Sequence, residues 1–135
     1  METVDIKTIV SEWQTCVNLA DSISKRRDHM NNIFITLNIA FITSIMAIQN
    51  FNNILTIIIG VLITIIWTLL ILNYRQLNKA KFKVINELEK KLPYQPMNKE
   101  YEYLKSNKKY CDFSLIELLI PTIFCIFYIA FYFIM

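Results

Sequence analysis

The sequence predicts an all-α membrane protein: a long antiparallel transmembrane helical hairpin with cytoplasmic extensions, plus a third transmembrane helix. Of the 135 residues, 55% are hydrophobic and the mean hydropathy is +0.39, which is unusual for a soluble domain. The hydrophobic residues are also concentrated in three runs, 33–48, 54–73 and 113–135, in which Glu117 is the only Asp, Glu, Lys, Arg or His side chain. A soluble bundle would need far more polar surface to cover three such runs, so we expect membrane spans.

The first element, residues 1–30, is predicted to be a cytoplasmic amphipathic helix. Its apolar residues recur three and four positions apart, which places them on one face of a helix. They are Ile6, Ile9, Val10, Trp13, Val17, Ala20 and Ile23. The segment contains neither Pro nor Gly. We therefore expect this helix to continue into the first span without a break.

Transmembrane helices are predicted at residues 31–50 and 54–73. A helix rises about 1.5 Å per residue, so residues 54–73 reach roughly 30 Å, the thickness of the hydrocarbon core. The first uncharged run covers only about 24 Å at that rise, so it is extended through its flanking Asn and Gln residues.

The second span is predicted to leave the membrane as a cytoplasmic helical extension, residues 74–92, which ends before Pro93. One face of this extension is apolar. Its residues are Leu77, Val84, Ile85, Leu88 and Leu92. Residues 54–92 would then form one helix, and its apolar face would pack against the face of residues 1–30. Residues 93–112 are predicted to be a cytoplasmic linker with a short helix capped by Asn98, followed by transmembrane helix 113–135.

The orientation follows from the positive charges, because membranes keep Lys and Arg preferentially on the cytoplasmic side. All 14 Lys and Arg precede the first span or lie between the second and third spans. We therefore expect a cytoplasmic N-terminus, cytoplasmic residues 74–112 and a C-terminus outside.

Small and polar residues recur every fourth position in the first two spans. They are Thr36, Ala40 and Ser44 in the first span, with Asn38 beside them, and Thr56, Gly60, Thr64 and Thr68 in the second. Small residues let membrane helices approach closely, so the two rows can pack against each other within one chain. Alternatively, a ring of copies could turn the polar residues inward to line a water-filled pore, or copies could associate through them without a passage.

Glu117 also has two interpretations. An intramembrane carboxylate can serve as an ion or proton site. However, residues 114–117 read Ser-Leu-Ile-Glu, the pattern of a capping box that satisfies the first amides of a helix. Pro121 removes the amide that would bond to the carbonyl of Glu117, so we expect a kink there.

Basic residues flank the spans and could bind anionic lipid, a nucleotide or an acidic partner, although orientation and interfacial anchoring are their usual explanation. They are Lys25, Arg26, Arg27, Arg75, Lys105, Lys108 and Lys109. We expect no direct nucleic acid binding, no cofactor and no metal site. His29 is the only histidine, Gly60 is the only glycine, and Cys16, Cys111 and Cys125 form no paired motif, so an enzyme is not expected.

Two stretches resemble a known family. "SKRRDHMNNIFITLN" (24–38) running into a span, and "NYRQLNKAKFKVINELEKKLP" (73–93) leaving the next, are similar to small bacterial integral membrane proteins of the SLATT type. The resemblance implies a two-helix membrane hairpin with a cytoplasmic extension, encoded beside defence modules and disrupting the membrane when triggered. The third span departs from that minimal plan.

Together these observations predict an oligomeric membrane effector or pore-forming accessory protein of a bacterial defence system, located in the inner membrane. Its partners would be the lipid bilayer, further copies of the chain and a cytosolic protein of the defence system. The alternative is a non-conducting membrane scaffold that anchors a cytosolic complex through its cytoplasmic helices. Leak from dye-loaded liposomes distinguishes the two.

Overall fold

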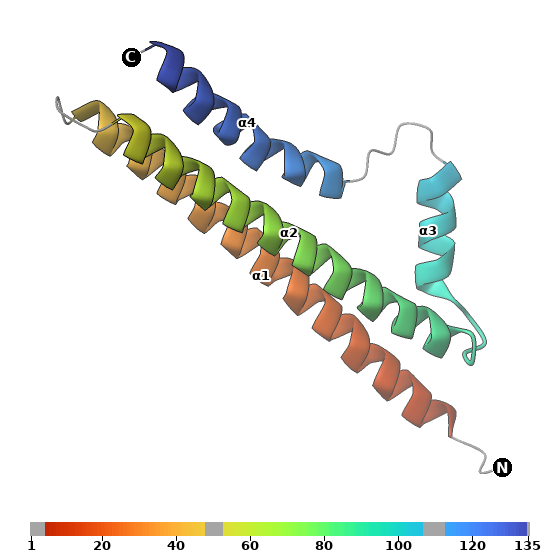
Figure 1. Cartoon of the computed structure of the whole chain (residues 1–135). Coiled ribbons are helices and arrows are strands. Elements are labelled where there is room, and N and C mark those ends of the chain that lie inside the picture. The colour runs from red at the N-terminus through yellow and green to blue at the C-terminus, as the bar shows by residue number, and fades with distance from the viewer. Residues whose placement is uncertain (1–4, 48–52, 107–112, 135) are drawn as a thin grey trace. The chain divides into compact units, whose positions relative to one another are not determined.

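The protein, seen in a computed structural model, is all-α as predicted (Figure 1). The structure describes residues 5–47, 53–106 and 113–134. Its helices are α1 (Ile6–Ala47), α2 (Asn53–Glu89), α3 (Pro96–Ser106) and α4 (Phe113–Ile134). The chain divides into two compact units. Unit 1 comprises Met1–Lys25 and Tyr74–Cys111, and unit 2 comprises Arg26–Asn73 and Asp112–Met135.

In unit 2, parts of α1 and α2 pack with α4. Arg27 and Asn38 of α1 contact Glu117 and Tyr128 of α4 respectively, so these two helices run parallel. Tyr128 also lies against Gly60 of α2. The α1 side chains that face this core recur three and four residues apart, the spacing of helices that pack along a shared seam. They are Asn31, Phe34, Asn38, Phe41 and Ile45.

In unit 1, the beginning of α1 packs against the end of α2, and Ile9, Ala20, Ile85 and Glu89 are buried. The helix α2 ends at Glu89, three residues before the predicted end. The ring of a proline clashes with the carbonyl four residues earlier, which for Pro93 is that of Glu89. After the last helical turn, two backbone hydrogen bonds between residues three apart close the chain into a turn. The amide of Lys91 donates to the carbonyl of Leu88, and that of Leu92 to the carbonyl of Glu89.

The short helix predicted within residues 93–112 is α3, but its predicted cap is wrong. The helix begins at Pro96, a favourable first position because proline has no amide to satisfy. Asn98 therefore lies inside the first turn. Its backbone amide, with that of Met97, donates to the carboxylate of Glu89 at 3.1 and 2.9 Å.

The predicted cytoplasmic stripes are only partly buried. Ile9, Ala20 and Ile85 are buried, whereas Ile6, Val10, Leu77 and Val84 are exposed. The contact between two helices covers only part of each circumference, so a broad apolar stripe extends beyond it.

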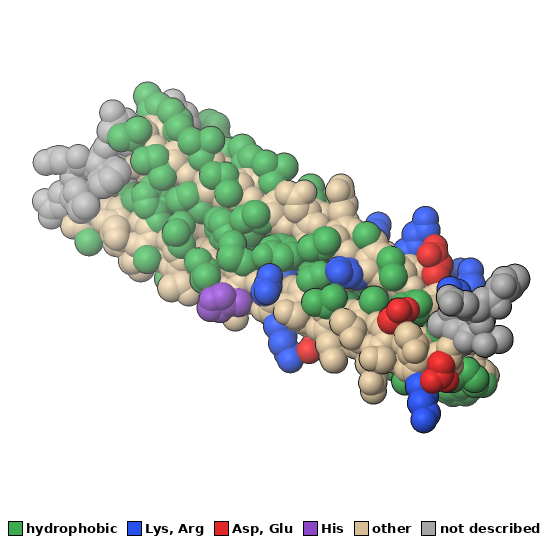
Figure 2. Space-filling model, turned by 90° about the horizontal axis from the view of Figure 1, so that it is seen from below, with side chains coloured by type: hydrophobic (Ala, Val, Ile, Leu, Met, Phe, Trp, Pro, Cys, Tyr) green, Lys and Arg blue, Asp and Glu red, His purple; other side chains and the backbone are tan. Residues whose placement is uncertain are grey.

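The helices α1 and α2 each contain a segment long and apolar enough to cross a membrane, while the apolar part of α4, Ile116–Phe131, is shorter. In Figure 2 hydrophobic side chains cover much of unit 2, and charged side chains gather over unit 1. The third span and the transmembrane hairpin remain predictions.

Candidate functional site

Unit 2 holds a set of polar side chains in its interior, which we call the polar core. Its members come from α1, α2 and α4. They are Arg27, Asn31, Asn38, Trp67, Glu117 and Tyr128. A polar group away from water is costly unless it finds a partner, and in this set every member contacts another.

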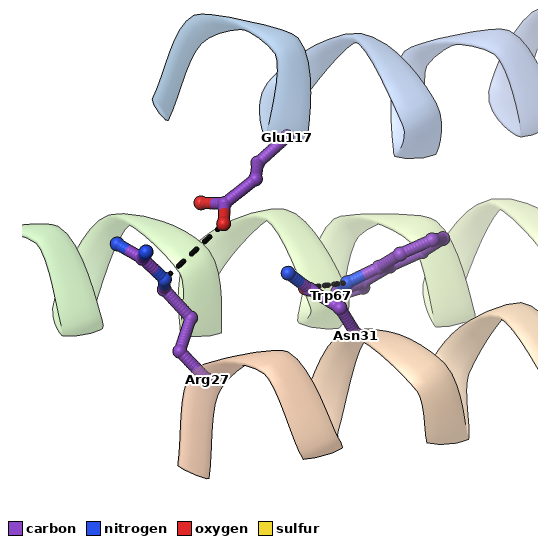
Figure 3. Close-up of polar contacts among 4 residues, drawn as sticks. All are labelled: Arg27, Asn31, Trp67 and Glu117. Atoms are coloured by element: carbon purple, nitrogen blue, oxygen red, sulfur yellow. Dashed lines mark hydrogen bonds and ion pairs between the residues drawn. The ribbon is translucent and has the colours of Figure 1, made fainter. Parts of the chain in front are cut away.

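An ion pair joins α1 to α4. The Nε of Arg27 lies 3.2 Å from Oε1 of Glu117, and Figure 3 shows the two side chains pointing toward each other. Both are largely buried, with side-chain exposures of 16% and 6%. Removing one partner of such a pair leaves an uncompensated charge, so the pair fixes how α4 sits on α1. The side chain of Ser114 lies outside the described part, so the capping-box prediction stays untested.

Trp67 connects α2 to α1 about one helical turn after Arg27, at Asn31. Its Nε1 donates to Oδ1 of Asn31 at 2.9 Å (Figure 3), and its ring stacks on Phe34 with centroids 5.6 Å apart. Phe124 of α4 completes the cluster at 6.0 Å. Trp67 was not among the residues predicted from the sequence. An amphipathic aromatic inside an apolar run, with its N–H in need of an acceptor, is the signal that could have identified it.

Asn38 is fully buried and both ends of its amide are bonded. Its Nδ2 donates to the carbonyl of Phe34 at 2.7 Å, and its Oδ1 accepts a hydrogen bond from the hydroxyl of Tyr128 at 2.8 Å. An amide within an apolar run needs a hydrogen-bond partner, and the structure identifies it as Tyr128, ninety positions away.

The row on α2 is mostly buried, and Tyr128 lies against its glycine. Thr56, Gly60 and Thr64 are buried and Thr68 is half-buried. A methyl group placed on Gly60 would lie 2.6 to 2.7 Å from ring atoms of Tyr128, closer than carbon atoms can pack. The hydroxyl of Thr64 donates to the carbonyl of Val61 and that of Thr68 to Thr64. At Gly60 this row therefore packs against α4.

The matching row on α1 does not face α2, so the prediction that the two rows pack together within one chain is wrong. Thr36, Ala40 and Ser44 are all exposed. Thr36 and Asn38 are two residues apart, about 200° around the helix, so with Asn38 in the core Thr36 must point away from it. The physical reason is that the bulky positions of α1 bury more apolar area against α2 and α4 than the small row would.

The predicted basic residues are not one cluster in the structure. Lys25 pairs with Asp21 at 2.7 Å on the surface of α1, and this carboxylate raises the pKa of Lys25. Arg27 belongs to the polar core. Arg26 and Lys105 are exposed and Arg75 is half-buried. Lys108 and Lys109 lie outside the described residues.

Unit 1 has its own buried carboxylate, that of Glu89, which was not among the site residues predicted from the sequence. Besides the two amides at the start of α3, it accepts a hydrogen bond from Nε1 of Trp13 at 3.2 Å. A carboxylate is favoured at a helix N-terminus, where unpaired amides and the helix dipole carry partial positive charge. Within the described residues, no three His, Cys, Asp or Glu side chains gather closely enough to hold a metal ion.

Comparison with known proteins gives one result. The family model described as the octameric membrane protein family (8xMP) matches residues 10–135, which is nearly the whole chain. No curated protein and no solved structure matches the sequence.

Proposed function

Because the chain belongs to the octameric membrane protein family, we propose that eight copies enclose a water-filled pathway through the membrane, lined by the outward face of α1. Family membership supports membrane association and a homo-oligomer. The pathway is the further step, and one observation carries it: the small and hydroxyl side chains of α1 point away from the core of unit 2, on a face that they share with exposed Ile33 and Leu37.

We call this outward face the hydroxyl stripe. It comprises Asn32, Thr36, Ala40, Thr43, Ser44 and Ala47, all of them exposed in the single chain. The hydroxyl hydrogens of Thr36, Thr43 and Ser44 already bond to carbonyls of α1, at 2.7 to 3.0 Å. Their oxygens can still accept hydrogen bonds from water. Small side chains allow close approach of a neighbouring copy, and the hydroxyl oxygens can meet water, so this face suits a subunit contact or a water-filled lining.

The buried row on α2 is a weaker candidate for a lining. Thr64 is only 2% exposed and Gly60 is covered by Tyr128, so neither can face a passage in a chain folded this way. A test of conduction therefore belongs on α1, and Thr36 is an exposed member of its hydroxyl stripe.

The experiment compares two threonine variants in dye-loaded liposomes and planar bilayers. We expect Thr36→Leu to reduce leak and single-channel conductance severalfold, because each of eight copies adds an apolar side chain to the lining. Thr122→Leu is the matched control, since Thr122 is exposed on α4 and its hydroxyl also bonds to its own helix, at 2.8 Å. Equal conductance for Thr36→Leu and wild type, with the octamer intact by native mass spectrometry, would refute the lining.

In the cell we propose that this pathway belongs to an effector or accessory protein of a bacterial defence system, which disrupts the inner membrane when triggered. The resemblance of residues 24–38 and 73–93 to SLATT-type proteins supports that role. The alternative, a non-conducting scaffold for a cytosolic partner, predicts octamers that cause no leak under any condition. An adjacent gene for a nucleotide-sensing or nucleic-acid-cleaving protein would favour the effector.

A further inference from the structure

Unit 1 exposes apolar side chains although it is the highly charged part of the chain. It contains 12 of the 14 Lys and Arg and 8 of the 11 Asp and Glu, so hydrocarbon cannot surround it. Nevertheless Leu77 and Val84 of α2 are 47% and 45% exposed. They are seven residues apart, two helical turns, and therefore share one face. We call this pair the α2 strip.

A second strip lies on α1. Val10 is 37% exposed and Val17, seven residues later, is half-buried, so they also share a face. We call this pair the α1 strip. Aligned apolar residues at heptad spacing that the fold leaves exposed or only half-buried are typical of helices that pack on a further helix.

The two strips lie at the same height in unit 1. Trp13 of α1 hydrogen-bonds Glu89 of α2, which sets these residues level. Val17 follows Trp13 by four residues. Because α2 runs antiparallel, the residue of α2 level with Val17 is four positions before Glu89, which is Ile85. Val84 is the next residue, about 1.5 Å further along the helix axis. By the same count Asp21 of α1 is level with Lys81 of α2. Asp21 pairs with Lys25 of its own helix but is 60% exposed, so it can also meet a cation of another copy at this level.

Height matters because of ring symmetry. In a closed ring every copy is related by rotation about one axis, so a residue keeps its height and meets residues of the next copy at that height. Such a contact is heterologous, joining two different faces. Two apolar strips of one chain, level with each other and flanked by opposite charges, meet this requirement.

We propose that the α2 strip of one copy packs on the α1 strip of the next copy in the octamer, with Val84 against Val17 and Lys81 near Asp21. The inference rests on the octameric family and not on conduction, so it can fail or hold independently of the proposed pathway.

The test is disulfide crosslinking in membranes between two differently tagged, co-expressed full-length chains. Both chains carry serine in place of the native cysteines Cys16, Cys111 and Cys125. One chain carries Val17→Cys and the other Val84→Cys. We expect a crosslinked pair containing both tags on mild oxidation, and little crosslinking when either variant is expressed alone. Phe82→Cys is the matched control for Val84→Cys, because Phe82 is also exposed and apolar but lies about 200° away around α2.

Three results would overturn the inference. The first is efficient crosslinking of Val84→Cys with itself, which indicates a two-fold contact. The second is crosslinking through Phe82→Cys as efficient as through Val84→Cys. The third is absence of the mixed product in a sample that is octameric by native mass spectrometry.

A second measurement needs no disulfide. Val84→Glu is expected to raise the protein concentration at which octamers dissociate by about tenfold or more, since each contact loses a buried valine. Phe82→Glu is expected to leave it within about twofold. If Val84→Glu leaves the octamer unchanged, another molecule covers the strip and the inference is wrong. Normal crosslinking without any leak from liposomes would instead refute the proposed pathway and leave this contact standing.

Discussion

The close approach of α2 and α4 at Gly60 makes a prediction whose sign depends on one ring. In an exposed helix, Gly→Ala stabilises by about 1 kcal/mol, because alanine is the better helix former. At Gly60 the new methyl group would lie 2.6 Å from the ring of Tyr128, so the ring must move by about 1 Å to reach an ordinary contact of 3.5 Å or more. Overpacking of this kind costs about 1 to 3 kcal/mol.

The ring cannot move freely, because its hydroxyl donates to Asn38 at 2.8 Å and Asn38 is fully buried. A shift of about 1 Å would stretch this bond beyond hydrogen-bonding distance and leave a buried acceptor unsatisfied, at a further cost of about 1 to 3 kcal/mol. After subtracting the gain in helix propensity, we expect Gly60→Ala to lower the free energy of unfolding by about 1 to 5 kcal/mol.

The assay is thermal unfolding in detergent micelles, followed by tryptophan fluorescence. A cost of 1 kcal/mol corresponds to about 4 °C in Tm for a chain of this length, so Gly60→Ala should unfold at least about 4 °C below wild type. In the background Tyr128→Ala, which removes the ring, the same Gly60→Ala change should be neutral or stabilising. An equal loss in both backgrounds would refute the steric reasoning, as would unchanged stability in the wild-type background.

Three further predictions concern the charged groups. Glu117→Gln should destabilise unit 2 by about 3 to 5 kcal/mol, because it leaves Arg27 buried without its counter-charge. The Tm in micelles measures this loss. A double variant in which Arg27 is also replaced by Met should recover part of it. Glu89→Gln should weaken the start of α3, so limited proteolysis between α2 and α3 should become faster while cleavage elsewhere is unchanged. The hydrogen bond and charge of Asp21 raise the pKa of Lys25 above 10.5. The pair therefore stabilises the fold at neutral pH, and its contribution disappears as pH rises above about 10.5. NMR titration of Asp21→Asn should show the pKa of Lys25 falling back toward 10.5.

The positions of the long helices followed from patterns that are local in the chain. Segment 54–73 is uniformly apolar and the segment after it is amphipathic, so a helix running through both could be predicted, and α2 does so. Its end was predicted three residues late, because the effect of Pro93 reaches back to Glu89. Asn38 was recognisable as a buried amide needing a partner. The partner itself, Tyr128, was not recognisable, because nothing in a single sequence indicates which of several aromatic residues lies opposite.

The sequence by itself determined the all-α class, the apolar segments and the separation of charged from uncharged regions, since these depend on composition and on periodicity along one helix. Only the tertiary structure decided which face of each helix is inside. Rows of small residues on α1 and α2 look alike in sequence, but Gly60 lies under Tyr128 whereas Thr36 is exposed. That difference arises from competition among helix faces for contact with a third helix, α4, and the competition is settled by side chains far apart in the chain.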